Sequence, residues 1–296
     1  MRGIALIQSA PEFAVPVSSI RPHPLQAALV LALGLLVGCN RDAPQSGPGV
    51  NPPAQAAPAA AQPETEQPVT LKDSIETTPA YIIGISYPQA ASKYPPLARA
   101  LHDYAEASRA RLMQAVDGLH GAKPEAPFDL SLPFTTLVET PRVVVVGVDG
   151  TSYTGGEHGT PLVERFVWLP QMQQMLAAEQ LIPQARDWKP VSDYVRDQLM
   201  TQLSQQLDED EVLPEQRAPK MRRGSAAISA GTAPEVRNFS RFEPVMNADG
   251  SIRSLRFVFP PQQVAPYEAG QQTVEVPASV LRPLVAQEYR ELVRGE

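Results

Sequence analysis

Along residues 71–293, segments with the hydrophobic period of a strand are interleaved with segments that have the period of a helix, and this order limits the possible folds. Residues 81–87 alternate between inward and outward positions, which is the period of a strand. Residues 96–119 and 189–207 carry apolar positions three and four apart, which predicts two long amphipathic helices. Further strands are predicted at 128–134, 143–148, 162–169, 239–246, 255–259 and 274–276. Short turns join several of these strands, so we predict an α+β fold with a mostly antiparallel sheet, packed with the two long helices and a C-terminal helix at 280–293.

Two segments depart from simple alternation. Residues 143–148 read V-V-V-V-G-V, and a β-branched run without alternation predicts a strand that is covered on both faces. Residues 208–238 are first acidic, then basic, and then rich in Gly, Ser and Ala. We expect this second segment to be a solvated loop.

The N-terminal 38 residues have the pattern of an export signal. Residues 25–38 form an apolar run that is shorter than the roughly 20 residues of a membrane-spanning helix, and it ends at Cys39. Residues 36–39, L-V-G-C, resemble the bacterial lipobox, in which the cysteine is lipidated and the chain is cut before it. This resemblance implies a lipoprotein signal peptide at 1–38, with Cys39 as the lipidation site and the attachment point to a membrane. Asn40 follows Cys39, and the lack of an aspartate there favours the outer membrane, facing the periplasm.

Residues 39–70 differ from the rest of the chain in composition. They are rich in Pro, Ala and Gln, and residues 40–70 lack aromatic residues, Leu and Ile, so we expect a disordered Pro/Ala-rich tether. The remaining residues, 71–296, form the predicted α+β domain, with an opening strand-helix part at about 71–125 and a closing part at about 126–296. The formal net charge of −7 argues against nucleic acid as a partner.

A glycine-rich stretch, Y-T-G-G-E-H-G, occupies residues 153–159. Glycine admits positive φ, so Gly155, Gly156 and Gly159 predict a bulged turn between two strands. We expect His158 to be hydrogen-bonded to a neighbouring turn and to fix this crossing.

A catalytic reading of the same stretch makes His158 a general base, with Glu157 or Asp149 nearby in the sequence. Neighbouring residues of a strand point to opposite faces, which disfavours a Glu157–His158 pair. A zinc site needs three or four ligands, and the other histidines of the folded region are His102 and His120. We therefore expect no catalytic residue, metal or cofactor. An envelope hydrolase that acts on cell-wall glycan or acyl groups through His158 is the alternative.

The stretch at 153–159 resembles the Y-x-G-G-A-H-G element of the RsiV-like domain family. That family includes the extracellular domain of RsiV-type lysozyme-sensing anti-sigma factors and the accessory region of PdaC-type peptidoglycan deacetylases. Residues 81–88 are similar to its opening strand, and residues 257–277 are similar to its closing F-x-F-x-x-Y-x-V-A-P-Y-x-x-G…I-P element. The match covers roughly residues 75–293. Glu157 replaces the usual alanine, and Pro261 and Gln262 stand where an aromatic residue and a carboxylate are often found.

The resemblance implies a non-enzymatic cell-envelope lipoprotein that binds a lysozyme-like muramidase or peptidoglycan. The partner-binding residues that it suggests are Tyr153, His158, Pro266 and Tyr267, since a tyrosine on a rigid loop is a suitable interface anchor. An alternative makes Tyr267 and Phe257 core residues. A structural lipoprotein with an unrelated protein partner is a further option.

Overall fold

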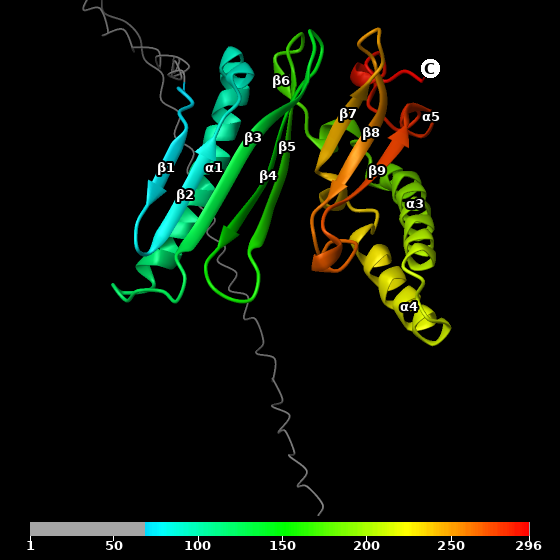
Figure 1. The fold of residues 1–296 in the computed structure, drawn as a ribbon. Helices are drawn as coiled ribbons and strands as arrows, with labels where there is room; N and C mark the ends of the chain where they lie inside the picture. The colour runs from blue at the N-terminus through cyan, green and yellow to red at the C-terminus, as the bar shows by residue number, and fades with distance from the viewer. Residues whose placement is uncertain (1–68, 296) are drawn as a thin grey trace, which may run out of the picture. The chain divides into compact units, whose positions relative to one another are not determined.

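The computed structural model describes residues 69–295, so the predicted signal peptide, Cys39 and nearly all of the tether lie outside the described residues. A six-stranded sheet is built in chain order from the first half of the described part (Figure 1). Its strands are β1 Ser74–Thr77, β2 Tyr81–Ser86, β3 Phe128–Glu139, β4 Val144–Tyr153, β5 Thr160–Leu169 and β6 Gln174–Met175. β2 and β3 are parallel and the other neighbours are antiparallel.

Helix α1, Pro95–Asp117, connects the parallel pair and covers one face of this sheet. A parallel connection needs such a crossover because its two strands begin at the same edge. The 3₁₀ helix η1, Gln89–Lys93, precedes α1. Leu97, Leu101 and Leu112 are fully buried and belong to one cluster with apolar residues of β2, β3 and β4. The predicted helix at 96–119 is therefore confirmed.

Strand β4 is covered on both faces, as the β-branched run predicted. Val144, Val146 and Val148 belong to the cluster under α1. Val145, and Val143 directly before the strand, belong to a second cluster on the opposite face. All five side chains are fully buried, so this strand separates two hydrophobic cores.

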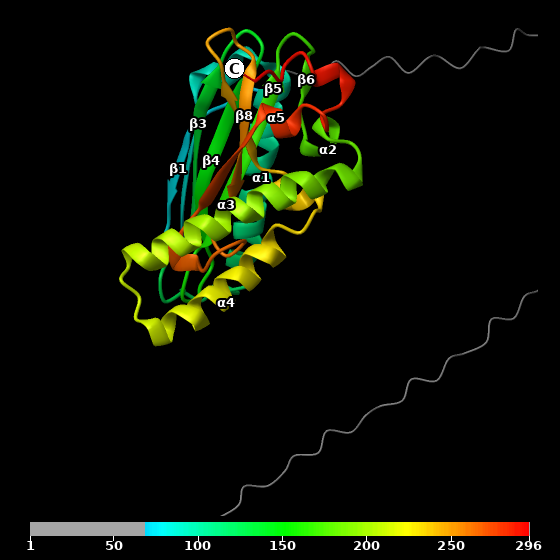
Figure 2. The same ribbon diagram turned by 90° about the vertical axis from the view of Figure 1, so that its right-hand side faces the viewer.

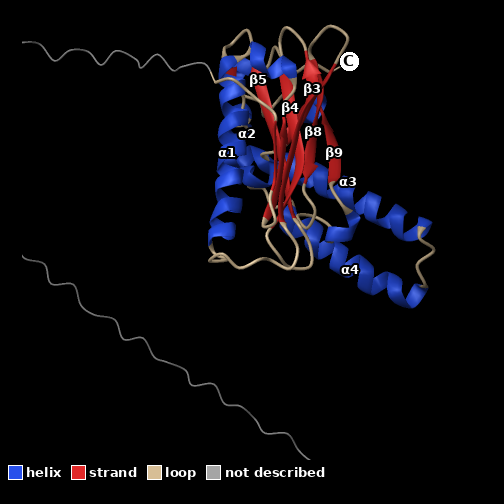
Figure 3. Ribbon diagram, turned by 60° about the vertical axis from the view of Figure 1, so that its left-hand side comes forward, coloured by secondary structure: helices blue, strands red, loops and turns tan. Residues whose placement is uncertain are grey.

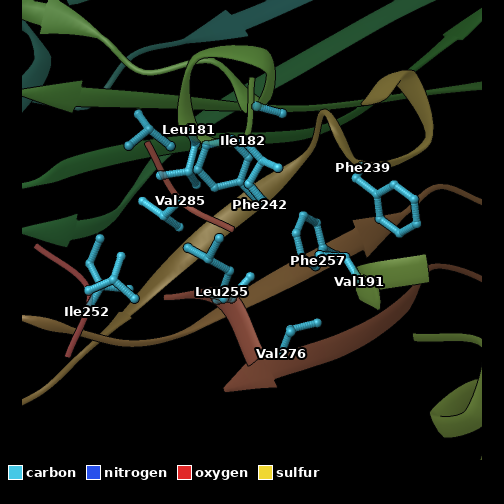
Figure 4. Packing of buried hydrophobic residues seen from close by; sticks show 14 of the residues in the cluster. Leu181, Ile182, Val191, Phe239, Phe242, Ile252, Leu255, Phe257, Val276 and Val285 are labelled. Atoms are coloured by element: carbon cyan, nitrogen blue, oxygen red, sulfur yellow. The ribbon is translucent and has the colours of Figure 1, made fainter. Parts of the chain in front are cut away.

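A three-stranded antiparallel sheet follows, with β7 Phe242–Met246, β8 Ile252–Phe259 and β9 Gln272–Pro277. Its apolar face packs on α3, Trp188–Glu209, and on the short helices α2, Ala178–Leu181, and α5, Ala278–Leu281. Figure 3 shows the succession of α1, the six-stranded sheet, β8 with β9, and α3. Figure 4 shows Leu255, Phe257 and Val276 pointing into the second core beside Val191. The α+β prediction is confirmed.

The prediction of a loop at 208–238 is wrong. Most of the segment forms α4, Pro214–Gly231, and η3, Val236–Phe239, follows it. α4 runs alongside α3 (Figure 2). Gly224 allows close approach to α3, because a Cβ there would lie 2.5 Å from Leu203 Cδ2. Ile228 is buried in the second core. Packing of this kind stabilises a helix whose composition alone does not indicate one.

The prediction of a helix at 280–293 is also wrong. α5 ends at Leu281, and only the short 3₁₀ helix η5, Gln287–Tyr289, follows. Pro283 has no N–H to donate and therefore disfavours a continued helix. The chain beyond it is held by long-range contacts instead: the Ala286 N–H donates to the Leu181 carbonyl at 2.9 Å. Within residues 69–295 no helix combines the length and apolar character needed to cross a bilayer.

Candidate functional site

The glycine-rich stretch forms the loop between β4 and β5. Their ladder keeps one register from Val144↔Trp168 to Ser152↔Thr160, so the loop follows directly and the expected bulge is not there. Gly155 and Gly156 have φ of +101° and +98°, and a Cβ at either would meet nothing within 4 Å. The two glycines are therefore required for backbone conformation and not for close approach.

Gly159 and Tyr153 stand at the two ends of this loop. Gly159 is outside the left-handed region, so its role is distinct from that of the other two glycines. The Tyr153 hydroxyl donates to the Gly156 carbonyl at 3.2 Å and braces the turn. Across the β3–β4 ladder Tyr153 pairs with Asp129, and burial raises the pKa of the Asp129 carboxyl.

His158 is in contact with Tyr267, which lies in the loop between β8 and β9. The two rings are stacked, with centroids 4.7 Å apart and planes inclined by 13°. Tyr267 begins the 3₁₀ helix η4, Tyr267–Ala269, directly after Pro266, whose φ is −57°. The His158 side chain is 44% exposed, and Tyr267 is half-buried. The stack links a hairpin of the six-stranded sheet to a loop of the three-stranded sheet. We expected His158 to form a hydrogen bond with a neighbouring turn, and it contacts the neighbouring loop through this stack instead.

The four predicted partner-binding residues thus lie on two adjoining loops. Tyr153 and His158 belong to the β4–β5 loop and its base, and Pro266 and Tyr267 belong to the β8–β9 loop. Pro266 is exposed. Phe257, by contrast, is 1% exposed and belongs to the second core. We call the surface formed by these four residues the tip.

The groups considered for catalysis are arranged differently. Glu157 Oε1 lies 3.8 Å from His158 Nε2, which is longer than the roughly 2.6–3.2 Å of a general-base hydrogen bond, and its side chain is 89% exposed. The Asp149 carboxylate accepts from Arg165. His102 contacts Asp103 on α1 instead. Among residues 69–295 no three or more His, Cys, Asp or Glu side chains form a group that could hold a metal ion.

An ion-pair network around the buried Arg165 side chain is the feature that sequence reasoning missed. The Arg165 side chain on β5 is 2% exposed and bonds two carboxylates, Asp149 on β4 and Glu243 on β7. Its Nη1 and Nη2 atoms donate to Asp149 at 2.9 and 3.2 Å, and its Nε donates to Glu243 at 2.6 Å. Gly147 on β4 makes room, because a Cβ there would lie 3.3 Å from Arg165 Cδ. The sequence did contain a signal for this site: Arg165 occupies the same inward face of β5 as the apolar residues Val163 and Val167.

The network continues along the three-stranded sheet. Arg256 on β8 lies between Glu243 on β7, at 3.3 Å, and Glu275 on β9, at 2.5 Å. The hydrogen bond from Arg256 lowers the pKa of Glu275. This pattern is a row of cross-strand charge pairs, which stabilises an antiparallel sheet.

Comparison with known proteins supports the fold and does not assign the chain to a family. No family model matches the chain, and no curated protein matches it. The structure is similar to a DUF3298 family protein from Pseudomonas aeruginosa PAO1, with a TM-score of 0.50 and 14% identity, over 76% of this chain and 94% of that chain. A DUF3298 family member from Bacteroides fragilis NCTC 9343 gives a TM-score of 0.42 and 14% identity, over 74% and 94% of the two chains. DUF3298 is a domain family of unknown function, and at this identity the likeness concerns the fold alone.

Proposed function

We propose that this chain is a non-enzymatic, lipid-anchored envelope protein whose tip binds a lysozyme-like muramidase. The observation that carries the proposal is the stacked His158–Tyr267 pair, held at the surface by two loops of different sheets. Tyrosine on a restrained loop loses little conformational entropy on binding, and such residues are common anchors of protein interfaces. The resemblance of the same two segments to the RsiV-like family suggests the muramidase as the partner, with peptidoglycan as the second ligand to test.

The surroundings of His158 favour binding over catalysis. Two surface cavities in the described part of the chain, of about 680 and 630 Å³, lie elsewhere and are not lined by any of the four tip residues. His158 is engaged in a stack and has one exposed carboxylate near it, at 3.8 Å. A histidine general base works best when a partner orients its ring within a site that excludes water.

Binding of the full-length chain to a c-type lysozyme and to purified murein sacculi tests the proposal. The variant Tyr267→Ala should weaken binding about 30-fold, because truncation of an interface anchor costs about 2 kcal/mol or more. His158→Ala should weaken it through loss of the stack. His102→Ala, which removes a similarly exposed histidine from α1, is the matched control and should bind like the unchanged protein. Absence of binding to both lysozyme and sacculi would refute the proposal.

A further inference from the structure

A polar cleft lies between the two sheets, away from the tip. Its volume is about 680 Å³, which is within the range of ligand pockets, about 300–1,000 Å³. One wall is formed by Leu137, Asp149 and Arg165 of the six-stranded sheet. The other wall is formed by residues of the three-stranded sheet, and two glutamines of α3, Gln198 and Gln202, complete the lining.

The edge strand β9 runs along this cleft. Residues 271 and 273–275 line it. The Val274 side chain is 3% exposed and packs in the second core, so Val274 borders the cleft with its main chain. Within residues 69–295 β9 pairs with β8 and with no other strand, so one row of its N–H and C=O groups has no strand partner. Figure 1 shows β9 at the outer edge of its sheet beside α3.

An unpaired strand edge is a template for another strand, and proteins usually block it. Here the edge borders a cleft whose other walls are Leu137, Asp149 and Arg165 of the six-stranded sheet and Gln198 and Gln202 of α3. The stretch from Gln271 to Glu275 spans five residues, so at about 3.4 Å per residue it is about 17 Å long and can pair with about five residues of another chain.

The charges of the cleft define the chemistry of the occupant. Three carboxylates, on Asp149, Glu243 and Glu275, accompany the two guanidinium groups of Arg165 and Arg256, so the lining has an excess negative charge. Asp149 is oriented by its two bonds from Arg165 and remains 53% exposed, and Glu275 is 40% exposed. These two carboxylates are therefore accessible to a cationic group.

We propose that the cleft binds an extended peptide segment that adds as a strand to β9 and directs a Lys or Arg side chain at Asp149 and Glu275. Strand addition obtains affinity from main-chain hydrogen bonds and selectivity from the side chains that flank the edge. None of the described residues that line the cleft is aromatic, so among them a sugar would have no ring face to pack against. Binding of a peptide in this cleft is independent of the partner of the tip.

Hydrogen–deuterium exchange of the full-length chain, with fragmentation that resolves single amides, tests the strand addition. The probe is the blocked peptide acetyl-Thr-Val-Lys-Val-Thr-amide at millimolar concentration. We expect slower exchange at alternate amides of β9 only, because successive N–H groups of a strand point to opposite sides. Uniform slowing along β9, or no change, would overturn strand addition.

Affinity measurements test the charge selectivity. The peptide with Glu in place of Lys should bind at least about tenfold more weakly, and Asp149→Asn and Glu275→Gln should each weaken the Lys peptide about three- to tenfold. Glu125→Gln, an exposed acid in the loop before β3, is the matched control and should change nothing. Binding of an N-acetylglucosamine trimer in the cleft, without binding of the peptide, would overturn the proposal in favour of a glycan site. Loss of binding in the Glu125→Gln variant would also overturn it.

Discussion

Replacement of Arg165 by methionine is expected to destabilise the fold by about 3 kcal/mol, because it leaves a buried carboxylate without its main partner. The Arg165 and Glu243 side chains are 2% and 12% exposed, and Nε lies 2.6 Å from Oε1. Removal of one member of a buried pair costs about 3–5 kcal/mol. The lower end applies here, since Arg256 still lies 3.3 Å from Glu243 and shares its charge.

Two further variants distinguish the contribution of the buried Arg165–Glu243 pair from that of the more exposed Arg165–Asp149 pair. Asp149 bonds the same guanidinium, but its side chain is 53% exposed, so Asp149→Asn should cost less than about 1 kcal/mol. The double variant Arg165→Met, Glu243→Leu should recover most of the loss, because apolar replacement of a whole buried ion pair is often neutral or stabilising. The expected order of stability is therefore Asp149→Asn, then the double variant, then Arg165→Met.

Urea unfolding, followed by tryptophan fluorescence, measures these differences in the free energy of unfolding. Trp168 and Trp188 are both buried, so their emission reports loss of the two cores. For a domain of this size about 1 kcal/mol shifts Tm by about 2–4 °C, so Arg165→Met should lower Tm by about 6–12 °C. A loss below about 1 kcal/mol in Arg165→Met would refute the expected cost of breaking the buried Arg165–Glu243 pair. A double variant as unstable as the single one would refute the assignment of that cost to the unpaired Glu243 carboxylate.

Three other predictions concern glycines and acid stability. Gly231→Ala should cost about 1–3 kcal/mol in thermal unfolding, because its Cβ would collide with a backbone carbonyl of the loop after β8, whereas Gly84→Ala meets nothing within 4 Å and should be neutral or stabilising. Gly155→Ala and Gly156→Ala should each cost about 1–2 kcal/mol through their positive φ, and both should weaken binding at the tip; unchanged melting would contradict the role of these two residues in the turn. The pKa of Glu275 is held below its usual 4.5, so this carboxylate contributes stability above pH 4.5 that is lost as the pH falls through its folded-state pKa. The free energy of unfolding of Glu275→Gln should therefore fall less steeply below pH 4.5 in acid titration, and an equally steep fall would contradict this linkage.

The predicted elements that proved right depend on local signals. The alternation at 81–87, the helical stripe at 96–119 and the β-branched run at 143–148 each report the faces that a segment buries. The hairpin predicted from the strands at 239–246 and 255–259 is formed by β7 and β8, and Gly250 in its turn has φ of +79°. Hydrophobic periodicity and turn-forming residues are local features of a sequence, so one amino-acid sequence is enough to recognise them.

The predicted elements that proved wrong depend on contacts with distant residues. α4 contains Pro219 and Gly224, both poor helix formers, and packs through the second of them on Leu203 of α3. The C-terminal segment is apolar enough for a helix, but Pro283 interrupts it and Val293 bridges Ile252 of β8. Tertiary packing outweighed local propensity at both places.

The candidate sites also divide into features that follow from local sequence and features that depend on contacts between distant residues. The α+β class, the two-sided burial of β4 and the glycine turn that carries His158 each follow from residue types over a few positions, so the amino-acid sequence was enough to predict them. The stack of His158 on Tyr267, and the bond from Arg165 to Glu243, a residue 78 positions away, depend on the folded arrangement. Such pairings are set by how two sheets pack together, and no local pattern records which side chains then come into contact.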